Sequence, residues 1–121
     1  MKKYWGYHLL LDCGWCDPEK IKDKANIEHW IKELVVDIDM EPVGEPYIAR
    51  VAEGQVDKAG YTAMQIIVTS HIAAHFVESA NCIYLDVFSC RKFDKETVKQ
   101  SMIKHFGCGS IREVYTTRQA D

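Results

Sequence analysis

The chain has 121 residues, 47% of them apolar, and a formal net charge of −3 at pH 7. This length supports one domain with a real core, spanning residues 1–121, and excludes two. No apolar run is long enough to cross a membrane, and the first residues do not form a secretory signal. The lysines and arginines are scattered, which argues against a nucleic-acid surface. We therefore expect a cytoplasmic protein that binds neither a membrane nor nucleic acid.

The first half of the chain predicts a strand, a helix and a second strand. Residues 5–13 end in an apolar run of strand length, and Asp-Pro-Glu at 17–19 is a helix-start signal. Apolar residues then recur at helical spacing, which predicts a helix over residues 26–39 that covers a sheet and stops at Pro42. This apolar stripe consists of Ile27, Trp30, Ile31, Leu34, Val35 and Ile38. Residues 46–51 predict a short strand.

The second half predicts two long strands, a helix and a closing strand. After a polar loop at 52–60, residues 61–70 and 81–90 are apolar runs typical of strands, and residues 72–77 continue or reverse the first. Asp94 begins a helix over residues 94–106, and residues 111–117 form the last strand. This order predicts an α+β fold, a two-layer α/β sandwich whose antiparallel or mixed sheet carries two helices on one face.

A polar cluster stands within the apolar strands of the second half. Residues 69–75 read Thr-Ser-His-Ile-Ala-Ala-His, and residues 88–90 read Phe-Ser-Cys. Hydroxyls, imidazoles and a thiol therefore lie on either side of an expected chain reversal, which is where a small domain would keep its chemistry. The alternative is a set of buried polar side chains that only satisfy one another's hydrogen bonds.

Two simple chemistries for this cluster find little support. His71, His75, Cys82 and Cys90 have the ligand types of a zinc site, but histidines four residues apart on a strand lie about 13 Å apart. Ser70 lacks the flanking glycines of a hydrolase nucleophile elbow. We therefore predict neither a metal site nor a serine hydrolase.

Cys13 and Cys16 form a C-x-x-C pair between a strand and a helix. Thioredoxin-like proteins keep their redox pair at this position, where the helix N-terminus lowers the thiol pKa. Such proteins need a proline that faces the pair from a later strand, and no proline here precedes a strand of the second half. Five cysteines without an export signal indicate reduced thiols. A dithiol oxidoreductase is the weaker alternative for the function of the protein. The role of Cys13 and Cys16 is left open.

The polar cluster resembles that of the bacterial and archaeal S-adenosylmethionine decarboxylases. In that family Glu-Ser-His-(apolar)-x-(apolar)-His precedes a strand that ends Asp-(apolar)-Phe-Thr-Cys, and residues 69–75 and 86–90 match this order and spacing. The segment His8-Leu9-Leu10 is similar to the family's opening Gly-(x)-His-Leu-Leu. The resemblance covers most of the chain and implies the same α+β sandwich.

The resemblance implies a proenzyme that cuts itself between Thr69 and Ser70. Ser70 then becomes a covalent pyruvoyl cofactor, His75 assists elimination of the ester, and Thr62 helps to stabilise the oxyoxazolidine stage. Cys90 aligns with the general acid that protonates the carbanion carbon after carbon dioxide leaves. The pyruvoyl ketone forms a Schiff base with the substrate amine and acts as an electron sink.

The implied reaction is decarboxylation of S-adenosylmethionine, which supplies the aminopropyl donor for polyamine and spermidine synthesis. By the same resemblance, His8, Asp12 and Glu78 contact this small-molecule substrate, and self-cleaved protomers form a homodimer. Thr69 replaces the family's Glu, and the 52–60 loop lacks an aromatic-proline sequence common there. Two alternatives therefore stay open: a pyruvoyl-dependent decarboxylase of ornithine or arginine, and a non-processing homologue that acts as a binding protein.

Overall fold

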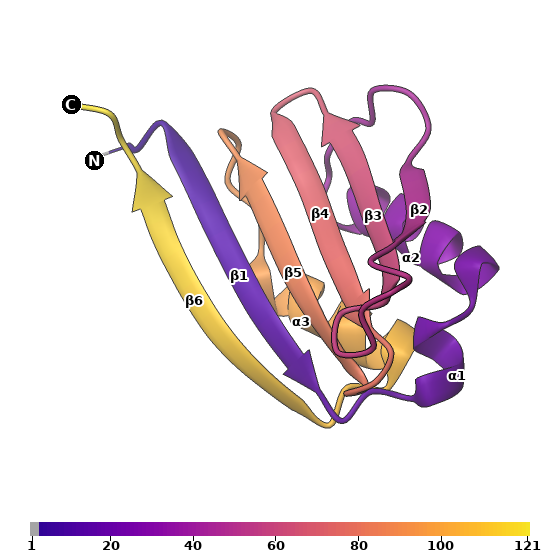
Figure 1. Cartoon of the computed structure of the whole chain (residues 1–121). Coiled ribbons are helices and arrows are strands. Elements are labelled where there is room, and N and C mark those ends of the chain that lie inside the picture. Colours follow the sequence, from indigo (N-terminus) through magenta and orange to yellow (C-terminus); the bar gives the residue numbers. More distant parts are fainter. Residues whose placement is uncertain (1–2) are drawn as a thin grey trace.

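The computed structural model describes residues 3–121, which form a six-stranded sheet with helices on one side (Figure 1). The strands are β1 (Gly6–Gly14), β2 (Tyr47–Val51), β3 (Gly60–Ile67), β4 (Ser70–Val77), β5 (Cys82–Ser89) and β6 (Ser110–Arg118). The helices are α1 (Pro18–Ile21), α2 (Lys24–Asp37) and α3 (Lys95–Phe106). The predicted α+β sandwich is confirmed.

Every neighbouring pair of strands is antiparallel, in the order β2-β3-β4-β5-β1-β6. Strand β1 lies between β5 and β6, so the first strand of the chain pairs with the last, and the two ends of the chain emerge side by side (Figure 1). The sequence left the sheet antiparallel or mixed, and the antiparallel alternative is correct.

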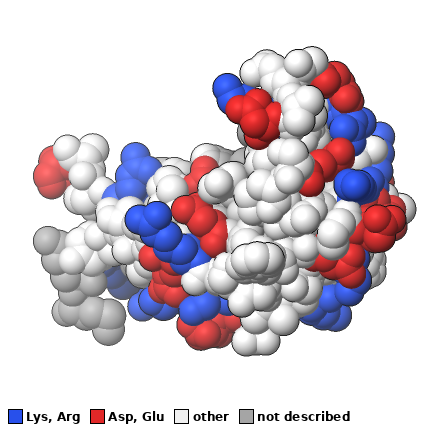
Figure 2. Space-filling view, turned by 60° about the horizontal axis from the view of Figure 1, so that its bottom comes forward, with Lys and Arg blue, Asp and Glu red and all other residues white. Residues whose placement is uncertain are grey.

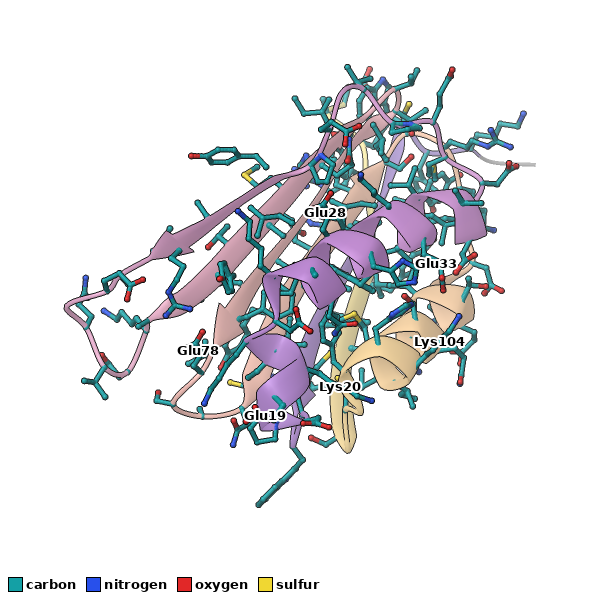
Figure 3. All side chains as sticks on the ribbon, turned by 90° about the vertical axis from the view of Figure 1, so that its right-hand side faces the viewer. Glu19, Lys20, Glu28, Glu33, Glu78 and Lys104 are labelled. Carbon is teal, nitrogen blue, oxygen red and sulfur yellow. The ribbon has the colours of Figure 1, made fainter. Side chains whose placement is uncertain are left out.

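Side chains alternate between a covered face and an open face of the sheet, because successive residues of a strand point to opposite sides. On β1, Leu9, Leu11 and Cys13 are buried, whereas Asp12 between the last two is exposed. The helices all lie on one side of the sheet (Figure 3). We call the uncovered side the open face.

The core between sheet and helices is built around Trp30 of α2. Its ring is fully buried and makes edge-on contacts with Phe76 of β4, at 5.9 Å between centroids, and with Phe106 of α3, at 5.3 Å. Such aromatic pairs add to the free energy gained by burying apolar area. The predicted stripe is confirmed, since all its members are buried: Ile27, Trp30, Ile31, Leu34, Val35 and Ile38.

Charged side chains join α2 to α3 at the surface. Lys104 Nζ lies 2.7 Å and His105 Nε2 lies 3.0 Å from Glu33 Oε1, and Figure 3 shows Glu33 and Lys104 on adjoining helices. The ammonium of Lys104, with a smaller contribution from His105, lowers the pKa of Glu33 to about 2. The carboxylate therefore stays ionised and helps to hold the two helices together across the neutral range.

Capping side chains set the helix boundaries and account for the differences from the predicted ones. Asp17 caps the short helix α1, which adds a third helix to the two predicted. Asp23 accepts hydrogen bonds from the backbone N–H groups of residues 25 and 26, so α2 begins at Lys24 and not at residue 26. The helix ends at Asp37, two residues before the predicted end. Asp94 caps α3 as predicted.

Exposed apolar side chains are frequent on the open face of the sheet. They are Tyr47, Val51, Met64, Ile66, Tyr84 and Val114. In the view of Figure 2, by contrast, Lys and Arg are interspersed with Asp and Glu and form no large patch of one sign. Within residues 3–121, no helix is long and apolar enough to cross a membrane.

Candidate active site

The bond between Thr69 and Ser70 lies at the tip of the β3–β4 hairpin. The strand predicted over residues 61–70 ends at Ile67, and a two-residue turn at 68–69 leads directly into β4. Ser70 has a φ of 150°, a conformation that residues with a Cβ rarely adopt. The reversal therefore holds Ser70 and the carbonyl before it in a strained arrangement.

The turn is tied to β5 through both the carbonyl and the side chain of Thr69. Its carbonyl oxygen accepts a hydrogen bond from the backbone N–H of Cys90 at 3.0 Å. Its hydroxyl accepts one from Ser89 Oγ at 2.7 Å and donates one to Met40 Sδ at 3.3 Å. The residue that replaces the family's Glu is thus fully engaged, and the carbonyl before Ser70 is polarised by an N–H donor.

Ser70 also stands at one end of a line of side chains that crosses the open face. Its Oγ lies 3.2 Å from His71 Nδ1, and His71 Nε2 lies 3.5 Å from Asp86 Oδ2. Asp86 Oδ1 is hydrogen bonded to His8 Nε2, and His8 Nδ1 lies 3.0 Å from Arg118 Nη1. Sequence reasoning gave no role to Asp86, although it begins the 86–90 motif, and missed Arg118. The available signal was an acid at an outward position of an otherwise apolar strand.

His75 and Thr62 face each other on neighbouring strands but lie far from Ser70. Thr62 Oγ1 is 2.8 Å from His75 Nδ1, and His75 Nε2 is 2.7 Å from the carbonyl oxygen of Lys58. Because a carbonyl only accepts, Nε2 carries the proton and Thr62 donates to Nδ1. Five residues of strand separate His75 from Ser70, which corresponds to about 16 Å. Within one chain, these two predicted site residues do not reach the scissile bond.

The other predicted site residues occupy different parts of the sheet. Cys90 is exposed and directly follows β5, so its thiol is at the same end of the sheet as Ser70. Asp12 is exposed on the open face of β1. Glu78 instead forms a two-pronged ion pair with Arg50, at 2.6 and 3.2 Å, which lowers the pKa of Glu78. The role of Glu78 in substrate binding stays a prediction.

The C-x-x-C cysteines are buried, and Cys16 contacts a third cysteine. Cys16 Sγ lies 3.2 Å from Cys108 Sγ, near the start of α1 and the end of α3. The hydrogen bond to Cys108, together with burial, raises the pKa of Cys16. The pKa of Cys108 is raised to about 12, chiefly by its hydrogen bond with Cys13. The raised pKa values keep the thiols of Cys16 and Cys108 protonated, which opposes thiolate chemistry at Cys16 in a dithiol oxidoreductase.

A surface hollow of about 620 Å³ adjoins the line of side chains near the chain ends. The rings of Trp5 and Phe88 lie 5.9 Å apart, and the Arg118 guanidinium lies 5.1 Å from the centroid of the Phe88 ring. The hollow is lined by Trp5, Phe88, Arg118, Gln119, Ala120 and Asp121. The volume falls within the range of small-molecule sites, and aromatic faces with a guanidinium can bind a flat ring and an anion.

A solved structure has the same fold over nearly the whole chain. The crystal structure of the adenosylmethionine decarboxylase from Aquifex aeolicus superposes with a TM-score of 0.82 at 19% identity and covers 99% of this chain and 95% of that one. The protein is therefore an α+β sandwich of the adenosylmethionine decarboxylase fold.

Sequence comparisons give the family. The family model of S-adenosylmethionine decarboxylase matches residues 7–119. A curated S-adenosylmethionine decarboxylase proenzyme of Clostridium botulinum (strain Loch Maree) is 26% identical over 117 residues, which is 93% of this chain and 94% of that protein. Another, from Pyrococcus furiosus, is 26% identical over 102 residues, 84% of this chain and 69% of that protein. The chain belongs to the S-adenosylmethionine decarboxylase family, and the family is one of carboxy-lyases.

Proposed function

We propose that this chain is a proenzyme that cuts itself between Thr69 and Ser70 and then decarboxylates S-adenosylmethionine with a pyruvoyl group made from Ser70. One observation carries the proposal: the Thr69 carbonyl, which precedes the Ser70 hydroxyl, accepts a hydrogen bond from the Cys90 N–H at 3.0 Å. A donor at this position stabilises the negative charge that develops on the oxygen when a nucleophile attacks the carbonyl. The strained φ of Ser70 further favours rearrangement of this bond.

The proposed self-cleavage needs only groups of the chain and one water. Ser70 Oγ attacks the Thr69 carbonyl carbon, the peptide nitrogen leaves, and an ester replaces the amide. Loss of the Ser70 Cα proton then expels the Thr69 carboxylate and leaves a dehydroalanine. Water converts this residue to a pyruvoyl group and releases ammonia. The products are chains of residues 1–69 and 70–121.

The pyruvoyl ketone supplies an electron sink for the electrons left when carbon dioxide departs. In this chain the Cys90 thiol is exposed at the same end of the sheet as Ser70, and we propose that it returns a proton to the substrate carbon. The product is the aminopropyl donor of polyamine synthesis. A cytoplasmic location accords with this role and stays a prediction.

We place the substrate against the open face, beside the hollow formed by Trp5, Phe88 and Arg118. Aromatic ring faces suit an adenine, and the guanidinium suits a carboxylate. The hollow adjoins His8, whose ring centroid lies 5.3 Å from that of Phe88. Asp12 lies further along the same strand, and its carboxylate suits a sulfonium cation.

We propose that the active protein is a homodimer in which two open faces pack together. Exposed apolar side chains on this face, Tyr84 and Met64 among them, support such an interface. The separation of about 16 Å between Ser70 and His75 supports it as well, because one chain does not complete the site. Across a two-fold axis, the partner's His75 and the partner's Thr62 reach Ser70, where they assist the elimination step.

The oligomeric state tests this interface. Tyr84→Glu places a charge in the middle of the open face, and light scattering should show a monomer that cuts itself slowly. Val36→Glu is the matched control, because Val36 is also an exposed apolar residue but lies on α2, on the other side of the sheet. A wild-type monomer with full activity would contradict the shared site.

Intact mass spectrometry tests the function as a whole. The wild-type preparation should show the two chains, the longer one, 1–69, with an ordinary carboxyl end and the shorter one beginning with pyruvate. Carbon dioxide should be released from S-adenosylmethionine and not from ornithine or arginine. Ser70→Ala should stay a single inactive chain. A fully active preparation that shows only the intact mass would refute the pyruvoyl mechanism, and an uncut, inactive wild type would favour a binding homologue.

A further inference from the structure

Four side chains lead from β6 to Ser70 in an unbroken line across the open face. The line contains Arg118, His8, Asp86 and His71, which come from four different strands, and we call it the relay line. Neither the self-cleavage scheme above nor the decarboxylation step uses Asp86 or His71. His71 nevertheless lies beside the Ser70 hydroxyl, which reacts in the proposed scheme, and Asp86 lies beside His71.

The proton positions along the first half of the relay line follow from Arg118. A guanidinium only donates hydrogen bonds, so His8 Nδ1, at 3.0 Å from Arg118 Nη1, is the acceptor. The proton of this neutral imidazole is therefore on Nε2, which donates to Asp86 Oδ1. Asp86 accepts this bond as a carboxylate. Arg118 and His8 together fix its orientation.

The second half of the relay line fixes the tautomer of His71. Asp86 Oδ2 lies 3.5 Å from His71 Nε2, and this nearby carboxylate favours the tautomer of the imidazole with its proton on Nε2. The lone pair then lies on Nδ1, which faces Ser70 Oγ at 3.2 Å. The ring of Phe88 packs beside both imidazoles, with centroids at 5.3 Å from His8 and 5.8 Å from His71. Packing against Phe88, the hydrogen bond to Ser70 and the contact with Asp86 thus hold the His71 ring in place.

We propose that His71 is the general base of the first cleavage step and that Asp86 is its positioning residue. This inference rests on the proposed function. His71 Nδ1 takes the Ser70 hydroxyl proton as Oγ bonds to the Thr69 carbonyl carbon, and the carbonyl electron pair moves to the oxygen. When that pair returns, the carbon–nitrogen bond breaks, and the imidazolium gives the proton to the leaving nitrogen. No proton is gained or lost overall, and the Asp86 carboxylate stabilises the transient imidazolium.

This assignment divides the work between two histidines. His71 is adjacent to Ser70 in the same chain and serves attack by the hydroxyl. His75, about 16 Å away along the strand, serves the later elimination from the partner subunit. Loss of His71 should therefore leave an uncut amide, whereas loss of His75 should leave an ester.

Intact mass over time follows cleavage of the freshly purified precursor. Because the ester and the amide have the same mass, hydroxylamine, which cleaves an ester and leaves an amide intact, measures the first step. We expect His71→Ala and Asp86→Asn to slow cleavage by on the order of 10²-fold. Asp86→Glu should recover much of the rate, because it keeps the carboxylate. Asp37→Asn, at the exposed end of α2, is the matched control and should cut at the wild-type rate. Added imidazole should restore part of the rate of His71→Ala, which a folding defect would not allow.

A second readout does not depend on cleavage. In the uncut Ser70→Ala chain, nitrogen-15 NMR of His71 should show the proton on Nε2, and Asp86→Asn should shift it toward Nδ1. A proton on His71 Nδ1 in the Ser70→Ala chain that keeps Asp86 would overturn the inference. So would wild-type cleavage rates in both His71→Ala and Asp86→Asn, and that result leaves the proposed function intact. A wild-type chain that never cuts overturns the proposed function and this inference with it.

Discussion

Replacing Cys90 with alanine should separate self-cleavage from turnover, because the backbone and the side chain of this residue have different roles. The backbone N–H polarises the Thr69 carbonyl at 3.0 Å, and alanine keeps that N–H. The thiol is exposed, so its loss should change the free energy of unfolding by less than about 0.5 kcal/mol. Cleavage at Ser70 should therefore proceed normally.

Turnover should fall in the same variant. Loss of a positioned general acid lowers the rate by about 10²–10⁴-fold, which corresponds to about 2.7–5.4 kcal/mol of barrier. The assay has two parts: intact mass for cleavage, and release of carbon dioxide from S-adenosylmethionine by the cut enzyme. Protonation at the wrong carbon should also convert the pyruvoyl group to alanine, which the mass of the 70–121 chain reports.

Cys82→Ala is the matched control for Cys90→Ala. Cys82 begins the strand that Cys90 follows, and eight residues of extended chain place it about 26 Å away. This variant should cut and turn over normally. Near-normal turnover of Cys90→Ala would refute the assignment of Cys90 as general acid and would indicate that Cys90 only packs at the end of its strand.

Two further predictions concern stability. Gly60→Ala should lower the free energy of unfolding by more than about 1 kcal/mol, because the new Cβ would lie 1.8 Å from a main-chain carbonyl oxygen of β4 at a φ of 156°. Gly54→Ala is the control, because a Cβ at Gly54 would have nothing within 4 Å. Equal midpoints of the two variants in urea denaturation would contradict this prediction. For Glu33, Lys104 lowers the folded pKa from 4.5 to about 2, so its stabilising contribution is complete above pH 4.5 and is lost as the pH falls toward 2. As the pH is lowered from 4.5 to 2, the Tm of Glu33→Gln should fall less steeply than the Tm of the wild type. Parallel curves of Tm against pH would exclude the ion pair as the cause.

Local signals in the sequence were enough for the elements and for part of the chemistry. Asp94 caps α3 where predicted, and the stripe that begins at Ile27 faces the sheet, because capping and helical spacing act within a few residues. The resemblance to the family rested on residues 69–75 and 86–90, which are short motifs, and the family model confirms it. These motifs alone are therefore sufficient to propose the chemistry of Ser70 and Cys90.

Only the tertiary structure decided what these residues face. The hydrogen bond from the Cys90 N–H to the Thr69 carbonyl and the line from Arg118 to Ser70 join strands that are far apart in the chain. These contacts depend on the register in which β1, β4, β5 and β6 pair, such as Ser70 opposite Ser89, and no local spacing encodes that register. The register of β3 on β4 likewise placed His75 opposite Thr62. Sequence thus determined which groups the protein has, and strand pairing determined which of them meet.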